Sequence, residues 1–445
     1  MVLQRDTADR SDSYFTLTDA PDAVVSVDIG TITEMETEGN CRKFHLTGIV
    51  TGGPYTLTLT VGDENIVFTD LYVGDVWVLA GQSNMTGCGY YNKTLSDYKP
   101  IEEIRFYSVD GLWKVGEPRM HFNNRTKDEF IKRYLGYNLN EYWEPRGVGP
   151  GYAFAVAMRE RTSAPQGLIA CALGGSAITH WDPDAPREPE PNLYGIMLRK
   201  YAECGGNARG LFWYQGCSDA YPDGAEHFTE RTVHFVESFR RDFARPDIAF
   251  VQVQIYQYVC ADPATDGIWR QVREAQRTLY ECVANMDTVA VTNAELADGI
   301  HLQGNSQTIL GKHAAESMYH LCFDPYGMTS TLAPQLDTIY PILHANDAGG
   351  VLAVKYKNLN GRLISEGRPT GYAVSMSPDK LDRRHIFRVD LHNDTAYVRH
   401  EIPYEQMKNA YLFYMFGNDT YVNITDEDGR AIPAMGPIAL KEYLE

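Results

Sequence analysis

The stretch Asp75-Val-Trp-Val-Leu-Ala-Gly-Gln-Ser-Asn-Met85 joins an apolar run to an abrupt polar turn. Val76 to Leu79 are rich in residues that favour β structure, which predicts a buried strand. Gly81 permits a sharp turn, and the polar residues Gln82 and Ser83 follow it directly. Such a turn lifts a side chain to the carboxyl edge of a sheet, where α/β enzymes place their nucleophiles. Ser83 is therefore a candidate nucleophile.

A serine hydroxyl needs a base, a group that orients the base, and donors for the developing oxyanion. His301 and Asp298 follow the predicted strand 287–292 in one loop, so both side chains can reach the sheet edge that carries Ser83. Asp298 would hold the Nδ1–H of the imidazole and leave Nε2 for the serine proton. The pair could instead cap the helix predicted at 303–321, and alone it is weak evidence among 12 histidines and 59 acidic residues.

Two other predicted strands end in groups that could stabilise an oxyanion. Strand 167–172 breaks into Gly174-Gly175, whose backbone N–H groups could face a substrate without side-chain obstruction. A plain turn between strand and helix explains the two glycines equally well. Gln215 directly follows the apolar strand 210–214 and could donate its side-chain amide, or it could be a buried glutamine satisfied by the core.

The eight cysteines are scattered and form no Cys-x-x-Cys pair, which indicates reduced thiols rather than a disulfide framework or a metal site. Cys88 and Cys217 flank the candidate site. Nothing basic adjoins either residue in sequence, so both are expected to act as small apolar residues and not as nucleophiles.

The composition bounds the class of protein. The 445 residues are too many for one ordinary core and predict two or three domains, with 44% hydrophobic and 22% charged residues. A net charge of −19 and a pI of about 5.1 argue against nucleic acid or an anionic membrane as the main partner. The polar start of the chain has no apolar segment of an export signal. We expect a cytoplasmic protein, or a secreted or periplasmic one if such a signal has been removed.

The hydrophobic pattern divides the chain into three parts. Residues 1–70 and 331–445 alternate polar and apolar positions over short runs, which predicts antiparallel, β-sandwich-like regions. Residues 71–330 alternate short apolar strands with helix-length segments, which is typical of an α/β domain with a parallel sheet. The segment 109–149 matches no regular element and could roof a binding site. Predicted helices of the central part cover 150–161, 193–204, 224–243, 268–284 and 303–321; its strands cover 75–80, 103–108, 167–172, 210–214, 249–255 and 287–292.

Four motifs together carry a resemblance to a known family. In chain order they are Gly81-Gln-Ser-Asn-Met85, Gly174-Gly175 with Trp181 downstream, Trp213-Tyr-Gln-Gly216, and Asp298-x-x-His301. The chain resembles the sialate O-acetylesterase family of the SGNH (GDSL-like) hydrolases over residues 55–325. That family often carries a β-rich flank on each side.

The resemblance implies a flavodoxin-like α/β catalytic domain and deacetylation of O-acetylated sugars without a cofactor. It implies that Ser83 is the nucleophile, His301 the base and Asp298 its orienting group. The implied oxyanion donors are the backbone N–H of Ser83, a backbone N–H of Gly174 or Gly175, and the Gln215 side chain.

The chain departs from the family pattern at two positions. Cys217 stands where members often have glutamate, and Leu302 stands where many have proline. The first change alters the polar surroundings of Gln215 and could alter the substrate preference.

The expected partner is an acetylated mono- or oligosaccharide, either an acetylated sialic acid or a hemicellulose fragment. Candidate sugar-binding residues are Gln82, His180, Trp181 and Asp219. Trp181 could equally belong to the core, and Asp219 could merely cap the next segment. Two alternatives stay open: a non-catalytic carbohydrate-binding protein, and another short-chain ester hydrolase on the same scaffold.

Overall fold

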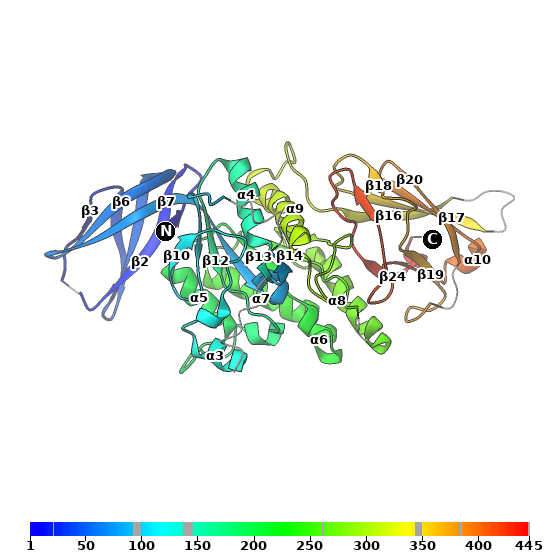
Figure 1. Cartoon of the computed structure of the whole chain (residues 1–445), viewed down its shortest axis with the longest axis horizontal. Helices are drawn as coiled ribbons and strands as arrows, with labels where there is room; N and C mark the ends of the chain where they lie inside the picture. Colours follow the sequence, from blue (N-terminus) through cyan, green and yellow to red (C-terminus); the bar gives the residue numbers. More distant parts are fainter. Residues whose placement is uncertain are drawn as a thin grey trace.

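The structure is a computed structural model that describes residues 1–20, 22–91, 99–136, 146–259, 262–342, 349–381 and 385–443. Figure 1 shows a β-rich region at the N-terminal end, helices packed on a sheet in the middle, and a second β-rich region at the C-terminal end. Within the described ranges, every helix is too short or too polar to span a bilayer.

The central sheet confirms the predicted α/β class. Its strands lie in the order β10-β9-β12-β7-β13-β14-β15, and every neighbouring pair from β9 to β15 is parallel. Parallel strands are buried on both faces and therefore need helices on both sides. The strands are β7 (Glu64–Gly81), β9 (Ile104–Tyr107), β10 (Trp113–Val115), β12 (Gln166–Ala170), β13 (Gly210–Tyr214), β14 (Ala249–Val253) and β15 (Met286–Val289).

Helices cover the two faces of this sheet according to the alternation of side chains along each strand. Trp77 and Leu79 of β7 pack in one hydrophobic cluster with α4 and α9, whereas Val76 and Val78 pack in another with α5 and α7. The helices are α1 (Ser83–Thr86), α3 (Glu129–Leu135), α4 (Gly151–Thr162), α5 (Leu193–Glu203), α6 (Pro222–Glu226), α7 (Phe228–Asp242), α8 (Asp266–Thr278), α9 (Gly304–Phe323) and α10 (Tyr404–Met407).

Most predicted elements of the central part are confirmed, and two expectations need correction. The predicted helix 224–243 is interrupted at His227, which separates α6 from α7. The segment 109–149 was expected to lack regular structure, but it contains β10, α3 and β11 (Arg146–Val148). α3 is only seven residues long and buries Ile131, so its periodic signal is too short to be recognised. Residues 137–145 lie outside the described residues.

The N-terminal β-rich region joins the central sheet through a single strand. The first part of β7 pairs antiparallel with β6, and its last part lies between β12 and β13. The domain boundary predicted at residue 70 stays a prediction, because β7 runs through it without interruption. The other strands here are β1 (Val2–Gln4), β2 (Arg10–Thr18), β3 (Val25–Val27), β4 (Thr31–Glu38), β5 (Cys41–Val50) and β6 (Gly52–Val61), and β8 (Gly89–Tyr90) follows α1.

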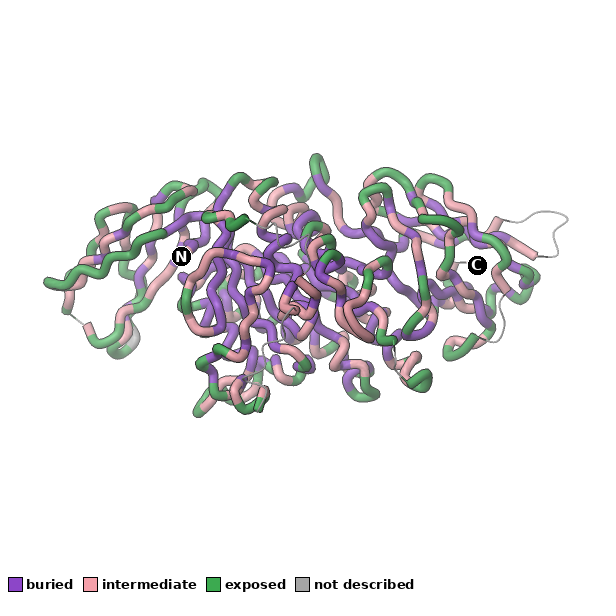
Figure 2. Tube along the Cα trace, viewed as in Figure 1, coloured by how far each residue is buried: buried purple, intermediate pink, exposed green. Residues whose placement is uncertain are grey.

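The C-terminal β-rich region packs on the helices of the central part. Its apolar side chains belong to the same hydrophobic cluster as α4 and α9, whereas the N-terminal region has a small cluster of its own. Figure 2 shows buried chain continuing from the centre into the C-terminal region. Its strands are β16 (Gln335–Ile342), β17 (Gly350–Lys357), β18 (Leu363–Ser365), β19 (Tyr372–Ser375), β20 (Ile386–His392), β21 (Thr395–His400), β22 (Tyr411–Tyr414), β23 (Ile424–Asp426) and β24 (Met435–Ala439).

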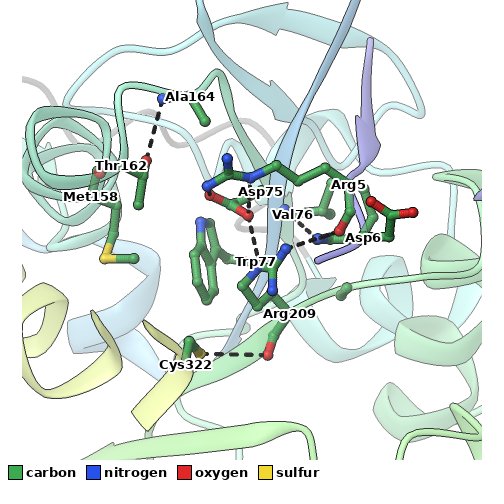
Figure 3. A network of polar contacts seen from close by, with 12 residues as sticks. Arg5, Asp6, Asp75, Val76, Trp77, Met158, Thr162, Ala164, Arg209 and Cys322 are labelled. Carbon is green, nitrogen blue, oxygen red and sulfur yellow. Dashed lines mark hydrogen bonds and ion pairs between the residues drawn. The ribbon is translucent and has the colours of Figure 1, made fainter. Parts of the chain in front are cut away.

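A buried ion-pair network holds β7 where it enters the central sheet. Arg5 donates Nε to Oδ1 of Asp75 at 3.0 Å and Nη2 to Oδ2 at 2.8 Å. Arg209 donates Nε to Oδ1 of the same carboxylate at 2.7 Å, and Asp75 is fully buried. Figure 3 shows both guanidinium groups directed at Asp75 beside Trp77. One carboxylate therefore connects the N-terminal segment, β7 and the start of β13.

Replacing Asp75 by asparagine should destabilise the fold, because it leaves two largely buried guanidinium groups without their counter-charge. Breaking a buried ion pair in this way costs about 3–5 kcal/mol. We expect the melting temperature of D75N, followed by circular dichroism, to fall by about 3–5 °C. Asp223→Asn, which removes the exposed partner of Arg231, is the matched control and should change the melting temperature little. Equal melting temperatures for D75N and the wild type would contradict the role given to Asp75.

Candidate active site

The end of β7 places Ser83 at the carboxyl edge of the sheet. Gly81 has a φ of +124°, and a Cβ built on it would lie 2.3 Å from the Tyr214 carbonyl oxygen of β13. Only glycine fits this close contact between the two strands. The Gln82 N–H donates to the same carbonyl at 2.9 Å, and α1 begins at the next residue, Ser83.

Ser83, His301 and Asp298 lie in a hydrogen-bonded line. Nε2 of His301 is 3.0 Å from Oγ of Ser83, and Nδ1 of His301 is 2.9 Å from Oδ2 of Asp298. The Asp298 carboxylate also accepts the backbone N–H groups of Ile300 and His301 at 3.0 and 2.9 Å. The structure thus brings together three residues that are up to 218 positions apart in the chain.

Asn84 holds the histidine loop against α1, a role that the sequence patterns did not indicate. Its Oδ1 accepts the Leu302 N–H at 2.9 Å, and its Nδ2 donates to the Ile300 carbonyl at 3.3 Å. Gln307 of α9 donates to the Asn84 carbonyl at 3.1 Å. These contacts lie on both sides of His301 in sequence, so they fix the position of the loop that carries the imidazole.

Arg146 is a second site residue that the sequence analysis did not identify. Its Nη1 donates to Oδ2 of Asp298, its Nη2 donates to the Tyr90 hydroxyl at 3.0 Å, and its guanidinium lies 4.6 Å from the Tyr90 ring centre. Burial alone would raise the pKa of Asp298, but hydrogen bonds from Arg146, His301 and the backbone hold it far below its ordinary value. Asp298 is therefore a fixed anion beside His301.

Backbone N–H groups that could bind an oxyanion lie beside Ser83. A Cβ built on Gly174 would lie 3.6 Å from the Ser83 Cβ, so the glycine turn contacts the serine directly. Within the described part of the chain, the N–H groups of Ser83, Gly174 and Gly175 have no protein acceptor. Three unpaired donors next to a serine hydroxyl form the kind of arrangement that stabilises a tetrahedral oxyanion.

Gln215 is buried and is not among the residues that line the pocket of Ser83. Its Nε2 donates to the Ser176 carbonyl at 2.6 Å and to Oδ2 of Asp219 at 2.7 Å, and the residue is fully buried. Both amide protons are therefore directed at protein acceptors. The predicted oxyanion role of Gln215 finds no support in this geometry, because core packing rather than the strand end sets the direction of the side chain.

Trp181 and Asp219, two predicted sugar-binding residues, also belong to the interior. Trp181 is fully buried and packs at 5.1 Å from Trp213 and 6.3 Å from Phe235, so no face is free for a sugar. Asp219 is fully buried and accepts the Ile178 N–H at 2.7 Å, while burial raises its pKa. The geometry supports the structural interpretation of both residues.

Gln82 lines the pocket at Ser83, but it is buried and its amide is engaged within the protein. Its Oε1 accepts the N–H groups of Gly216 and Ser218 at 3.1 Å each, and its Nε2 donates to Ser218 Oγ at 3.3 Å. His180 is partly exposed and packs against α3: its ring centre lies 5.2 Å from that of Tyr134, and Nδ1 accepts the Ala177 N–H at 3.0 Å. Gln82 therefore positions the turn after β13, and His180 contacts Tyr134 of the pocket wall.

The two thiols beside the site are unsuited to nucleophilic attack. Burial raises the pKa of Cys88 to about 12 and that of Cys217 to about 12, so both stay protonated near neutral pH. Among the described residues, the single group spaced for a metal ion is Asp182, Asp184 and His234, which lies on the surface outside the pocket.

Ser83 and His301 lie at the bottom of an open pocket of about 600 Å³. Described residues of the segment 109–149, which was expected to roof a binding site, line one wall of this pocket. Burial lowers the pKa of His121 on this wall to about 3, so its imidazole is neutral. The lining residues from this segment are Arg119, Met120, His121, Phe122, Asn123, Asn124, Tyr134, Leu135, Arg146 and Gly147.

Comparisons with known proteins agree with this arrangement. A probable carbohydrate esterase of Arabidopsis thaliana is 29% identical over 262 residues, which cover 54% of this chain and 89% of that protein. Human sialate O-acetylesterase is 25% identical over 199 residues, only 36% of its own length and 38% of this chain. The crystal structure of a carbohydrate acetylesterase from Xanthomonas citri has a TM-score of 0.74 at 20% identity and covers 98% of this chain and 96% of its own, which shows that the whole fold is shared.

The family model for carbohydrate esterases described as sialic acid-specific acetylesterases matches residues 73–320, more than half of the chain. The match includes the last part of β7, Ser83, the glycine turn and the loop of Asp298 and His301. The chain therefore belongs to the carbohydrate esterase, sialic acid-specific acetylesterase family.

Proposed function

We propose that the protein is a serine O-acetylesterase that removes acetyl groups from sugars through an acetyl-enzyme. The observation that carries this proposal is the line from Ser83 through His301 to Asp298, with distances of 3.0 and 2.9 Å. A nucleophile, a base within hydrogen-bond reach and a carboxylate that orients the base are the parts that acyl transfer requires.

In the first half of the reaction, Nε2 of His301 takes the proton of Ser83 as Oγ attacks the acetyl carbonyl carbon. The tetrahedral oxyanion is stabilised by the backbone N–H of Ser83 and that of Gly174 or Gly175. Two backbone donors are enough for this task in serine hydrolases. His301 then gives its proton to the sugar oxygen, which leaves as a free hydroxyl.

In the second half, water replaces the sugar. His301 deprotonates the water, which attacks the acetyl carbonyl, and acetate leaves as the proton returns to Ser83 Oγ. Asp298 stays ionised throughout and stabilises the imidazolium. Its carboxylate is held by Arg146, so the anion does not rotate away from Nδ1.

An acetylated mono- or oligosaccharide suits the pocket as substrate. A volume of about 600 Å³ accommodates a ligand of that size. Acetate release should be measured with acetylated sialic acids and with acetylated plant oligosaccharides, together with an acyl chain-length series. Strong preference for acetyl over longer acyl groups and turnover of a sugar ester support the proposal; activity on simple esters alone would favour a general short-chain esterase.

Replacing Ser83 by alanine should abolish hydrolysis while leaving the fold intact. Loss of the nucleophile in serine hydrolases lowers kcat by at least about 10³-fold. Hydrolysis of 4-nitrophenyl acetate measures the loss, and circular dichroism checks the fold. Ser26→Ala, on an exposed position of β3, should retain full activity. Substantial activity of S83A would contradict the acetyl-enzyme mechanism and leave a binding protein with adventitious hydrolysis as the better description.

Replacing Arg146 by methionine should lower kcat/KM while leaving the fold intact. Arg146 donates to Oδ2 of Asp298, the same oxygen that lies 2.9 Å from Nδ1 of His301. Without this donor the carboxylate is held less firmly, so it orients the imidazole less well toward Ser83. A hydrogen bond to a charged group contributes about 1.5–3 kcal/mol, which corresponds to a loss of about 10- to 150-fold.

The measurement is kcat/KM for 4-nitrophenyl acetate, with circular dichroism as the check of the fold. Arg146→Lys keeps a cationic donor and should retain more activity than the methionine variant. Full activity of the methionine variant would show that Arg146 does not position Asp298.

A further inference from the structure

A tyrosine on the loop after β14 lies at the pocket from the side of the C-terminal region. Tyr258 lines the same pocket as Ser83 and His301, and it is 38% exposed. Large aromatic side chains that stay exposed at a pocket often serve in ligand contact. This position was not indicated by the sequence motifs.

Backbone and side-chain contacts hold the loop of Tyr258 between two parts of the molecule. The Tyr258 N–H donates to the Asn418 carbonyl at 3.0 Å, and Gln257 Nε2 donates to the Thr420 carbonyl at 3.1 Å, both in the C-terminal region. The Val259 N–H donates to the carbonyl of Gly299 at 2.7 Å, next to Asp298. The loop is therefore tied on one side to the C-terminal region and on the other to the histidine loop.

A buried arginine strengthens the connection to the C-terminal region. Arg273 of α8 donates to the Tyr256 carbonyl at 2.5 Å and to the Gly417 carbonyl at 2.9 Å. Among the described residues it has no carboxylate partner, and burial lowers its pKa to about 9. A guanidinium that is buried without a carboxylate partner needs fixed carbonyl oxygens as acceptors for its N–H groups. The backbone that precedes Tyr258 is therefore held in place before any substrate binds.

The ring of Tyr258 also has an aromatic support. Its centre lies 5.4 Å from that of Trp269, at an interplanar angle of 38°. Trp269 Nε1 donates to the Tyr256 carbonyl at 2.7 Å, so the supporting ring is itself fixed. A supported ring on a fixed loop offers an apolar face at little cost in conformational entropy.

We propose that the ring of Tyr258 packs against the sugar ring of the acetylated substrate, and that the C-terminal region determines this contact by holding the loop. The inference rests on the proposed function, since it assigns a specificity-determining residue to the same site. The apolar C–H face of a sugar packs on an aromatic face, whereas the acetyl group lies at Ser83. Tyr258 thus acts on binding of the leaving sugar and not on the chemical step.

The test compares Tyr258→Ala, Tyr258→Phe and wild type on an acetylated sugar and on ethyl acetate, which has no ring to stack. For Y258A we expect KM for the sugar ester to rise about tenfold with kcat nearly unchanged, because a contact equal in ground and transition states is lost. Activity on ethyl acetate should be unaffected, and Y258F should resemble wild type. Tyr326→Ala, at a tyrosine 91% exposed outside the pocket, is the matched control.

Three results would overturn the inference alone: an unchanged KM in Y258A, an equal loss on sugar ester and ethyl acetate, or a loss in Y258F as large as in Y258A. A wild-type enzyme that hydrolyses ethyl acetate but no acetylated sugar would instead overturn the proposed function, and the inference with it. The activity of wild type on the sugar ester therefore separates the two failures.

Discussion

The position of Ser83 depends on one strand that belongs to two sheets. β7 begins in the N-terminal region, paired with β6, and ends between β12 and β13 in the central sheet. At the point of passage Asp75 is fully buried and neutralised by Arg5 and Arg209. A buried carboxylate with two cations tolerates no displacement of the strand, since each charge would lose its partner in a medium of low dielectric. The strand therefore delivers Ser83 to the sheet edge in a fixed register.

The remaining parts of the site follow from the parallel order of the sheet. Because β12, β7 and β13 are adjacent and parallel, the glycine turn after β12 and the turn after β13 lie on either side of Ser83. The histidine loop comes from β15 at the far edge, and contacts of Asn84 on both sides of His301 bring it to the same place. Asn84, the residue after Ser83, is therefore needed to position His301 beside the serine.

A site residue could be predicted from the sequence where a local pattern marks it, such as a strand end followed by a polar residue. Ser83, Asp298 and His301 follow recognisable strand ends. The strand ends alone were weak evidence for pairing them, and the order of the four motifs along the chain carried that prediction. Gln215 follows the end of β13, and Trp181 follows the glycine turn. Whether either side chain faces the pocket or the core is decided by neighbours from other elements, such as Ser176 and Trp213. Arg146 begins β11, a strand of three residues that is too short to give a periodic pattern, and its contact with Asp298 spans 152 residues. No local pattern contains such information.

The two β-rich regions stand in different relations to the active site. The N-terminal region has its own small hydrophobic cluster. It meets the central part through β7, the Asp75 network and hydrogen bonds from β2 to the segment before β13. The C-terminal region shares its hydrophobic cluster with α4 and α9 and binds the loop of Tyr258 through backbone carbonyls. Backbone contacts do not depend on the identity of the side chains, so this support can persist while the side chains that face the pocket vary. A region that fixes a loop in this manner can determine how a sugar is held without contributing a side chain of its own to the pocket.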